Sequence, residues 1–270
     1  MNFEALQNIH KPHYEKATNL LTGYLLDLLN QKPDQTLNIL EIGPGSISVL
    51  LQGIVNCSQE MKTNGTKSID ICFIDQPVPK YQEIKSRDGQ LYFLTDTKEF
   101  KGAGYSGVIN LKASLIRSPF DDHSSEYPGG AFDAFSKKKF DFIVMHSVLH
   151  ELFIASKIAS DRYFPTLFQK LHGMLKDDGI LFFGDPYYPP YHGTLQSYSF
   201  VNDMAKAAEH ANAPVAFLHP EYLLALLLKS NEQNNKLGFK LLADEEMYIN
   251  YNEKGRKFYL IVLQKAGVAK

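Results

Sequence analysis

The chain has 270 residues, of which 44% are hydrophobic and 21% are charged, a composition typical of folded globular proteins and not of disordered or collagen-like chains. Its formal net charge is −2, so we do not expect a protein whose main task is to neutralise nucleic-acid phosphates. The length fits one to two domains of about 150 residues each.

The cysteine content and the length of the apolar runs indicate in which cellular compartment we expect the protein. Cys57 and Cys72 are too few for a disulfide framework or a Cys-rich zinc site, and we expect both to be buried thiols. The chain starts without an apolar run after basic residues, and its longest apolar run, residues 223–228, is far shorter than the roughly 20 residues that cross a bilayer. We therefore expect a cytoplasmic protein that does not enter a membrane.

Helical and strand-like patterns alternate through the first half of the chain. Apolar residues at helical spacing predict a helix over residues 14–30, and a short apolar run predicts a strand over residues 37–42. That strand stops at the Gly-Pro-Gly turn, and a second helix is predicted over residues 46–56. Further buried strands are predicted over residues 69–74, 107–111 and 140–145.

The second half begins with another helix and strand and ends in a hairpin. A helix is predicted over residues 161–175 and a strand over residues 180–183. Two helices are predicted near residues 202–211 and 221–229. The strand-like runs 239–251 and 257–264 are joined around Glu-Lys-Gly, which is typical of a hairpin.

This alternation predicts an α/β fold with a doubly wound, mostly parallel seven-stranded sheet and a C-terminal antiparallel hairpin. We expect residues 1–36 to form a helical N-terminal cap and residues 37–270 the main domain, with a lid or substrate insertion at residues 186–230. Ligands of such sheets bind at the carboxyl ends of the strands. Polar residues near predicted strand ends are therefore candidates, namely Glu41, Asp75, Ser114, His146 and Asp185.

The turn after the first strand could hold a ligand. Gly43 and Gly45 allow a sharp turn and a close approach to the backbone, and the helix that follows offers N–H groups to a pyrophosphate or a carboxylate. The third glycine of the dinucleotide fingerprint is absent. Asp75 could accept hydrogen bonds from two ribose hydroxyls, while a plain turn and a solvated strand end stay open as alternatives.

The order and spacing of four passages resemble class I S-adenosylmethionine-dependent methyltransferases. The resemblance covers residues 37–185 and rests on LNILEIGPGS, ICFID, FDFIVMHSVLHEL and LHGMLKDDGILFF. It implies the fold predicted above and S-adenosylmethionine as the cofactor. The chain departs from the family at Ile47, where members often have another glycine, and in its greater length on both sides of the second strand.

The resemblance also implies roles for individual residues. Gly43 and Gly45 would approach the methionine part of the cofactor, and Asp75 would hold its ribose. Ala113 and Ser114 would lie beside the adenine, after the third strand. The further expected cofactor contacts are Glu41 and His146 at strand ends, and Tyr14 on a helix that closes over the cofactor.

Methyl transfer needs an acceptor held in line with the methyl group, exclusion of water, and a base where the acceptor carries a proton. We expect His150 to act as this base and to line the acceptor site together with Glu151. A structural role for His150 stays open. We expect no metal site, because His146 stands where metal-dependent relatives have an acid and no matching further ligands are identifiable.

The aromatic, proline-rich segment 185–193 follows the fifth predicted strand. We expect it to form a semi-rigid loop over the site, with an apolar wall made of Tyr187, Tyr188 and Tyr191. The segment is similar to the Asp-Pro-Pro-Tyr motif of enzymes that methylate adenine in DNA, but that motif ends strand four. A plain connection is the other alternative.

These observations predict methyl transfer from S-adenosylmethionine to a small, partly apolar acceptor, at oxygen. We expect a small-molecule partner, no nucleic acid and no membrane, and the leucine-rich residues 222–228 leave a homodimer open. The alternatives are a protein side-chain methyltransferase, a nicotinamide-dependent oxidoreductase and a non-catalytic cofactor-binding module.

Overall fold

The computed structural model divides into two compact units. The N-terminal unit contains residues 14–146, and the C-terminal unit contains residues 147–270 together with residues 1–13. The residues that the structure describes are 3–45, 47–61, 67–75, 83–94, 99–102, 109–117, 132–149, 160–187, 220–228, 238–248 and 257–266.

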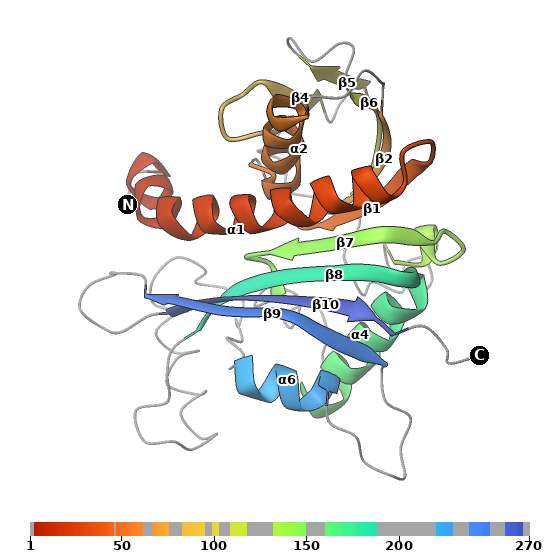
Figure 1. Ribbon diagram of the computed structural model, residues 1–270. Helices are drawn as coiled ribbons and strands as arrows, with labels where there is room; N and C mark the ends of the chain where they lie inside the picture. Colours follow the sequence, from red (N-terminus) through yellow and green to blue (C-terminus); the bar gives the residue numbers. More distant parts are fainter. Residues whose placement is uncertain are drawn as a thin grey trace. The chain divides into compact units, whose positions relative to one another are not determined.

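Seven strands form the main sheet (Figure 1). They are β1 (Thr36–Ile42), β2 (Lys67–Asp75), β6 (Ile109–Arg117), β7 (Phe140–His146), β8 (Leu175–Tyr187), β9 (Phe239–Tyr248) and β10 (Lys257–Lys265). Their order is β6-β2-β1-β7-β8-β10-β9. β1 is parallel to β2 and β7, β2 is parallel to β6, and β10 is antiparallel to β8 and β9. The predicted α/β fold and its C-terminal hairpin are confirmed.

The parallel strands of the N-terminal unit are apolar because both of their faces are covered. Every residue of β7 is buried, as are the last four residues of β1. Two helices, α1 (Phe3–Gln31) and α2 (Val49–Glu60), pack closely on each other at Gly53. A Cβ atom there would lie 3.3 Å from a methyl carbon of Leu21 and of Leu25. α1 begins well before the predicted residue 14 and continues through Pro12.

A second, three-stranded antiparallel sheet was not predicted. It consists of β3 (Glu83–Lys85), β4 (Leu91–Leu94) and β5 (Glu99–Gly102), in that order. A turn over residues 86–90 joins β3 to β4, with Gly89 in the left-handed region at φ 71°. Ile84 and Leu91 anchor this hairpin, since both are buried.

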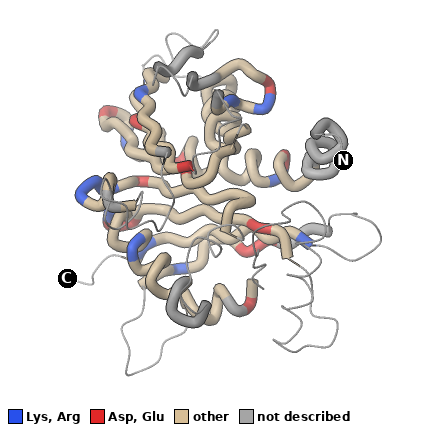
Figure 2. The backbone as a smooth tube through the Cα atoms, turned by 180° about the vertical axis from the view of Figure 1, so that it is seen from behind, with Lys and Arg blue, Asp and Glu red and all other residues tan. Residues whose placement is uncertain are grey.

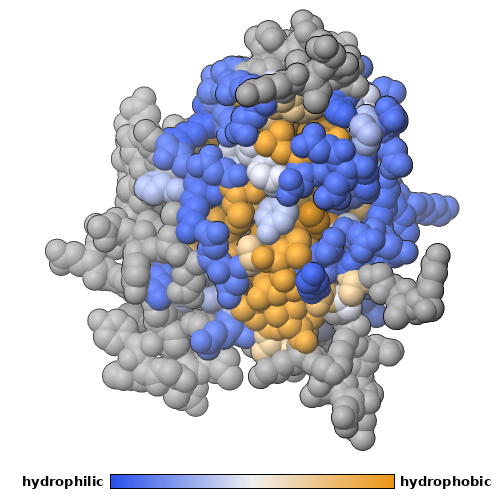
Figure 3. Space-filling model, viewed as in Figure 1, coloured by the Kyte–Doolittle hydropathy of each residue, from blue (hydrophilic) through white to orange (hydrophobic). Residues whose placement is uncertain are grey.

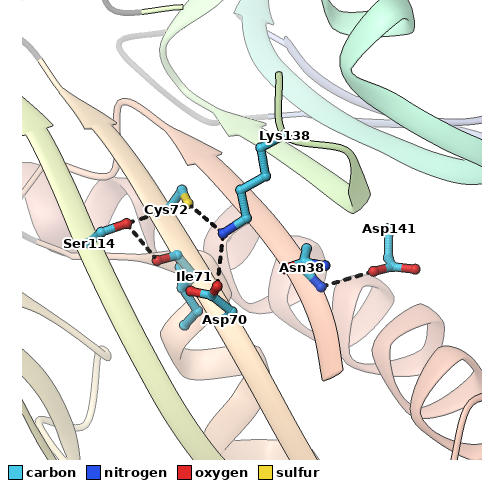
Figure 4. A network of polar contacts seen from close by, with 7 residues as sticks. All are labelled: Asn38, Asp70, Ile71, Cys72, Ser114, Lys138 and Asp141. Atoms are coloured by element: carbon cyan, nitrogen blue, oxygen red, sulfur yellow. Dashed lines mark hydrogen bonds and ion pairs between the residues drawn. The ribbon is translucent and has the colours of Figure 1, made fainter. Parts of the chain in front are cut away.

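Polar contacts cross the main sheet of the N-terminal unit (Figure 4). Lys138 lies between the 3-10 turn η1 (Asp133–Phe135) and β7, and its ammonium reaches Asp70 Oδ2 at 2.8 Å and Cys72 Sγ at 3.3 Å on β2. Asp141 of β7 is fully buried and accepts the Asn38 N–H at 2.9 Å. Both cysteines are buried free thiols, as predicted.

The C-terminal unit contains the helix α4 (Ser160–Met174), close to its predicted position. Its apolar residues recur at helical spacing and face β8, where the rings of Phe168 and Phe183 lie 5.5 Å apart. β8 is much longer than predicted, since it already begins at Leu175 and contains the Lys-Asp-Asp-Gly segment that the sequence suggested as a loop.

The helix α6 (Pro220–Leu228) packs against β9. Leu223 and Leu227 are buried, which agrees with the core role that its spacing predicts, whereas Leu224, Leu226 and Leu228 stay half-buried. Figure 3 shows apolar surface in the lower half of the face where α6 is seen in Figure 1. The predicted helix over residues 202–211 lies outside the described residues.

Charged residues of both signs are interspersed along the described backbone (Figure 2). Among the helices that the structure describes, none combines the length and the apolar character that spanning a bilayer requires.

Gly184 in β8 lies at a closely packed place between two strands of the C-terminal unit. It lies opposite Leu260 of β10 in the strand register. A Cβ atom at this position would lie 2.5 Å from Leu260 Cδ2, 2.8 Å from the Tyr259 carbonyl oxygen and 2.9 Å from Phe258 Cε1. Because one of these neighbours is backbone, the strand pair cannot accept even a methyl group without shifting.

We therefore predict that Gly184→Ala lowers the free energy of unfolding by about 2 kcal/mol through overpacking. Gly173→Ala is the matched control. Gly173 lies in α4 with open space around its Cβ position, so alanine should raise stability by about 0.5 kcal/mol through helix propensity. Urea denaturation measures both changes, and equal effects of the two variants would contradict this packing.

Candidate functional site

Three parallel strands of the N-terminal unit end at one edge of the sheet. β1 lies between β2 and β7, so their carboxyl ends are neighbours. Glu41, Asp75 and His146 lie at these ends and are only 2%, 8% and 7% exposed. The structure thus brings together three of the predicted cofactor-binding residues.

The glycine turn between β1 and α2 has the backbone that its sequence predicts. Gly43 and Gly45 have φ values of 65° and 58°, in the left-handed region that costs other residues roughly 1 kcal/mol or more. The Gly43 N–H donates to the Ile74 carbonyl at 2.7 Å and ties the turn to β2. Among the residues that the structure describes, and apart from its two chain neighbours, none places a heavy atom within 4 Å of the position of a Gly45 Cβ. The turn therefore presents bare backbone with open space beside it.

Ser48 and Glu41 occupy the N-terminus of α2. Ser48 is the N-cap, and its hydroxyl oxygen accepts the Leu51 N–H at 2.9 Å while its O–H donates to Glu41 Oε2. The other carboxylate oxygen, Oε1, accepts the Leu50 N–H at 3.5 Å. A helix N-terminus attracts anions, and here a carboxylate of the chain itself already takes that place.

Burial dominates the ionisation of Glu41. It raises the pKa of this carboxyl from its ordinary 4.5 to about 7, with the Asp75 charge adding to the increase. The hydrogen bonds from Ser48 and Leu50 act in the opposite direction, because they stabilise the charged form. Near neutral pH, Glu41 can therefore exist in either protonation state, and a cation beside it would favour the ionised one.

Tyr14 of α1 contacts both the segment after the glycine turn and the end of β7. Its hydroxyl donates to the Ile47 carbonyl, and its ring meets the His146 ring edge-on with centroids 4.9 Å apart. Burial, followed by the neighbouring Glu41 charge, raises the pKa of this phenol well above 10. Tyr14 is therefore neutral, and its hydroxyl fixes the segment that follows the glycine turn. Its contact with a cofactor stays a prediction.

Ala113 and Ser114 lie elsewhere than predicted. β6 extends to Arg117, so both residues lie inside the strand rather than after it. Ser114 is level with Cys72 and donates to the Ile71 carbonyl at 3.5 Å (Figure 4). Asp75 is instead level with Arg117. We placed Ala113 and Ser114 beside the adenine because we expected the strand to end at residue 111, and this boundary is wrong. A role of the two residues in binding adenine stays a prediction.

Tyr187 also differs from its predicted place. It is the last residue of β8, is 1% exposed and packs on Tyr259 at 5.9 Å between ring centroids. Asp185, the predicted strand end, is likewise buried within β8. The strand continues through the residues that we expected to begin a loop. The remaining predicted substrate residues lie outside the described part of the chain, namely His150, Glu151, Tyr188 and Tyr191.

Sequence reasoning missed Ser48 and Lys85 as parts of the site. A serine directly before an apolar helical run is an N-cap signal and could have identified Ser48. Lys85 contributes its carbonyl to Ser48 through a backbone hydrogen bond, which no side-chain pattern reveals. In the part of the chain that the structure describes, no three His, Cys, Asp or Glu side chains gather as a metal site would require.

Solved structures share this architecture. Loganic acid methyltransferase with SAH has a TM-score of 0.51 and 9% identity, over 94% of each chain. The chain has the class I methyltransferase fold. Two further solved structures have lower TM-scores. For a SAM-dependent methyltransferase from Methanosarcina mazei the TM-score is 0.47, with 13% identity over 88% of this chain and 97% of that chain. For N-methyltransferase NodS from Bradyrhizobium japonicum it is 0.44, with 12% identity over 95% of this chain and 89% of that chain. The sequence matches no protein-family model and no curated protein.

We predict that Glu41 makes stability depend on pH. Its pKa is about 7 in the folded protein and 4.5 in an ordinary environment, so between these values the folded state keeps a proton that the unfolded state has lost. The free energy of unfolding should therefore fall by up to about 3 kcal/mol as the pH rises from 4.5 to 7, relative to Glu41→Gln. Urea denaturation at several pH values measures the difference, and parallel profiles for the two proteins would contradict the burial of an ionisable carboxyl.

Proposed function

We propose that this protein transfers a methyl group from S-adenosylmethionine to a small, partly apolar acceptor, at oxygen. The fold supports this reaction class, and the chemistry of the glycine turn supports the cofactor. In this proposal Gly43, Gly45 and Asp75, at the carboxyl ends of β1 and β2, bind the cofactor.

The observation that carries the proposal is the carboxylate at the start of α2. Glu41 and Ser48 take up the Leu50 and Leu51 N–H groups, which a pyrophosphate would otherwise use. A dinucleotide would place its phosphates against Glu41 and near Asp75, with unfavourable repulsion. S-adenosylmethionine instead carries an ammonium and a sulfonium, and both are attracted by carboxylates. This difference argues against the nicotinamide-dependent alternative.

The residues of the turn fit this cofactor. The open space beside Gly45 leaves room for an amino-acid group to approach the backbone, and Asp75 ends β2 where a carboxylate can accept two ribose hydroxyls. Glu41, Tyr14 and His146 would complete the buried wall of the site. When bound, the cofactor supplies an electrophilic methyl group on its sulfonium.

The acceptor side of the proposal rests on the sequence. His150 would remove the proton of an acceptor hydroxyl, and Glu151, Tyr188 and Tyr191 would line the acceptor and exclude water. Tyr187 is left out of this set, because β8 holds it in the core. Acidic and basic residues are interspersed along the described part of the chain, which favours a small molecule over a nucleic acid as the acceptor (Figure 2).

We predict that Asp75→Ala weakens binding of S-adenosylhomocysteine at least about tenfold, since it removes two charge-assisted hydrogen bonds. Isothermal titration calorimetry measures the affinity. Asp70→Asn is the control, because Asp70 lies on the same strand but pairs with Lys138. No binding by the wild-type protein would refute the proposed function, and unchanged binding by Asp75→Ala would remove Asp75 from the ribose role.

A further inference from the structure

The β3–β4 hairpin is attached to the first turn of α2 at two points. At the first, the Ser48 N–H donates to the Lys85 carbonyl at 2.8 Å, and Ile47 forms a parallel bridge with Lys85. At the second, one helical turn further on, the Gln52 side chain accepts the Asp88 N–H at 3.0 Å and donates to Asp88 Oδ2 at 3.2 Å. The hairpin and the start of the helix therefore form a closed ring of hydrogen bonds.

The turn of this hairpin is held from within. Asp88 Oδ1 accepts the Ser86 hydroxyl at 2.7 Å and the Gln90 N–H at 3.0 Å. Ser86 is buried and exchanges two further hydrogen bonds with the backbone of Leu91. A side chain that holds Asp88 therefore also fixes Ser86, the residue next to the Lys85 carbonyl.

Ser48 connects this ring to the candidate site, because its hydroxyl donates to Glu41 and its backbone begins α2. We propose that the β3–β4 hairpin is a clamp on the glycine turn, in which Gln52 and Asp88 are positioning residues that hold Ser48, and through it Glu41 and the turn, in the cofactor-binding conformation. This inference rests on the proposed function for its effect on the cofactor, but the clamp itself is a property of the ligand-free protein.

The physical reason for a clamp lies in the turn itself. Gly43 and Gly45 have access to many backbone conformations, and no described residue beyond the chain neighbours of Gly45 packs against its Cβ position. A binding site that must order such a turn when the ligand arrives loses affinity, whereas a preformed turn does not. The contacts that preform this turn come from elements distant in the sequence, and the hairpin is one of them.

The test uses Gln52→Ala, which removes both hydrogen bonds of the second attachment point, and Asp88→Ala, which removes the one to Asp88 Oδ2 and the contacts that hold the turn. Asp88 is exposed and Gln52 half-buried, so both variants should fold. We expect S-adenosylhomocysteine to bind about fivefold to tenfold more weakly, the effect of losing roughly 1 kcal/mol of hydrogen bonding. The loss in the double variant should be smaller than the sum of the two single losses, since either change already removes the hydrogen bond from the Gln52 amide to Asp88 Oδ2. Additive losses would contradict the clamp.

Asn56→Ala is the matched control. Asn56 lies one turn further along α2 and accepts a hydrogen bond from the same Gln52 amide at 3.2 Å, but it has no contact with the hairpin among those described. This variant should bind the ligand as the wild-type protein does. A loss equal to that of Gln52→Ala would overturn the proposal.

Two readouts separate positioning from a general loss of stability. Hydrogen exchange of the ligand-free protein should be faster at the Ser48 amide in Gln52→Ala, with no change in β7.

The Ser48 hydrogen bond lowers the pKa of Glu41, which also faces Tyr14 from α1 and Asp75 from β2. Loosening Ser48 should therefore move the pH profile set by Glu41 to higher pH, whereas a purely structural role would lower stability at every pH alike.

These measurements also distinguish the two hypotheses. If the wild-type protein does not bind S-adenosylhomocysteine, the proposed function fails, and the exchange at Ser48 still decides whether the clamp exists. If the wild-type protein binds and both variants bind equally well with unchanged exchange at Ser48, the clamp is refuted while the proposed function stands.

Discussion

The hydrogen bond from the Ser48 hydroxyl to the Glu41 carboxylate joins the end of β1 to the start of α2 across the glycine turn. A buried carboxylate without such partners would cost several kcal/mol, so this contact and the Leu50 N–H make the position of Glu41 tolerable. Because Ser48 also caps α2, the same contact sets where the helix begins. The site around the turn depends on this one arrangement.

Two unfavourable features meet at this place. The Glu41 carboxyl is buried with a raised pKa, and the Tyr14 phenol is buried beside it. Such features cluster at functional sites more often than elsewhere, because a structure keeps them only when something else depends on them. Here they share one physical consequence. They place the carboxyl groups of Glu41 and Asp75 beside the backbone of the glycine turn.

Much of the fold could be predicted because its signals are local. The strand, turn and helix over residues 36–60 show a buried apolar run, two glycines and helical spacing in direct succession. Asp75 could be placed because it directly follows the apolar run of β2. The C-terminal hairpin could be placed from two long strand-like runs around Glu-Lys-Gly.

Other features depend on contacts that no local pattern shows. β3 and β4 have three and four residues, too few for an alternating pattern, and they are stabilised by Ile84, Leu91 and the ties to α2. α1 begins well before the predicted residue 14 and continues through Pro12. Pro186 suggested the start of a loop, yet it pairs with Phe258 of β10, and the strand carries Tyr187 into the core. In β8, strand pairing thus overrides the local signal of a proline.

The most direct test of this account is a crystal structure of the protein with S-adenosylhomocysteine. We expect the amino-acid end of the ligand to lie against the backbone of residues 43–45, and its ribose hydroxyls to lie about 3 Å from the Asp75 carboxylate. Ligand bound elsewhere, or no ligand at this turn at saturating concentration, would contradict the proposed cofactor site.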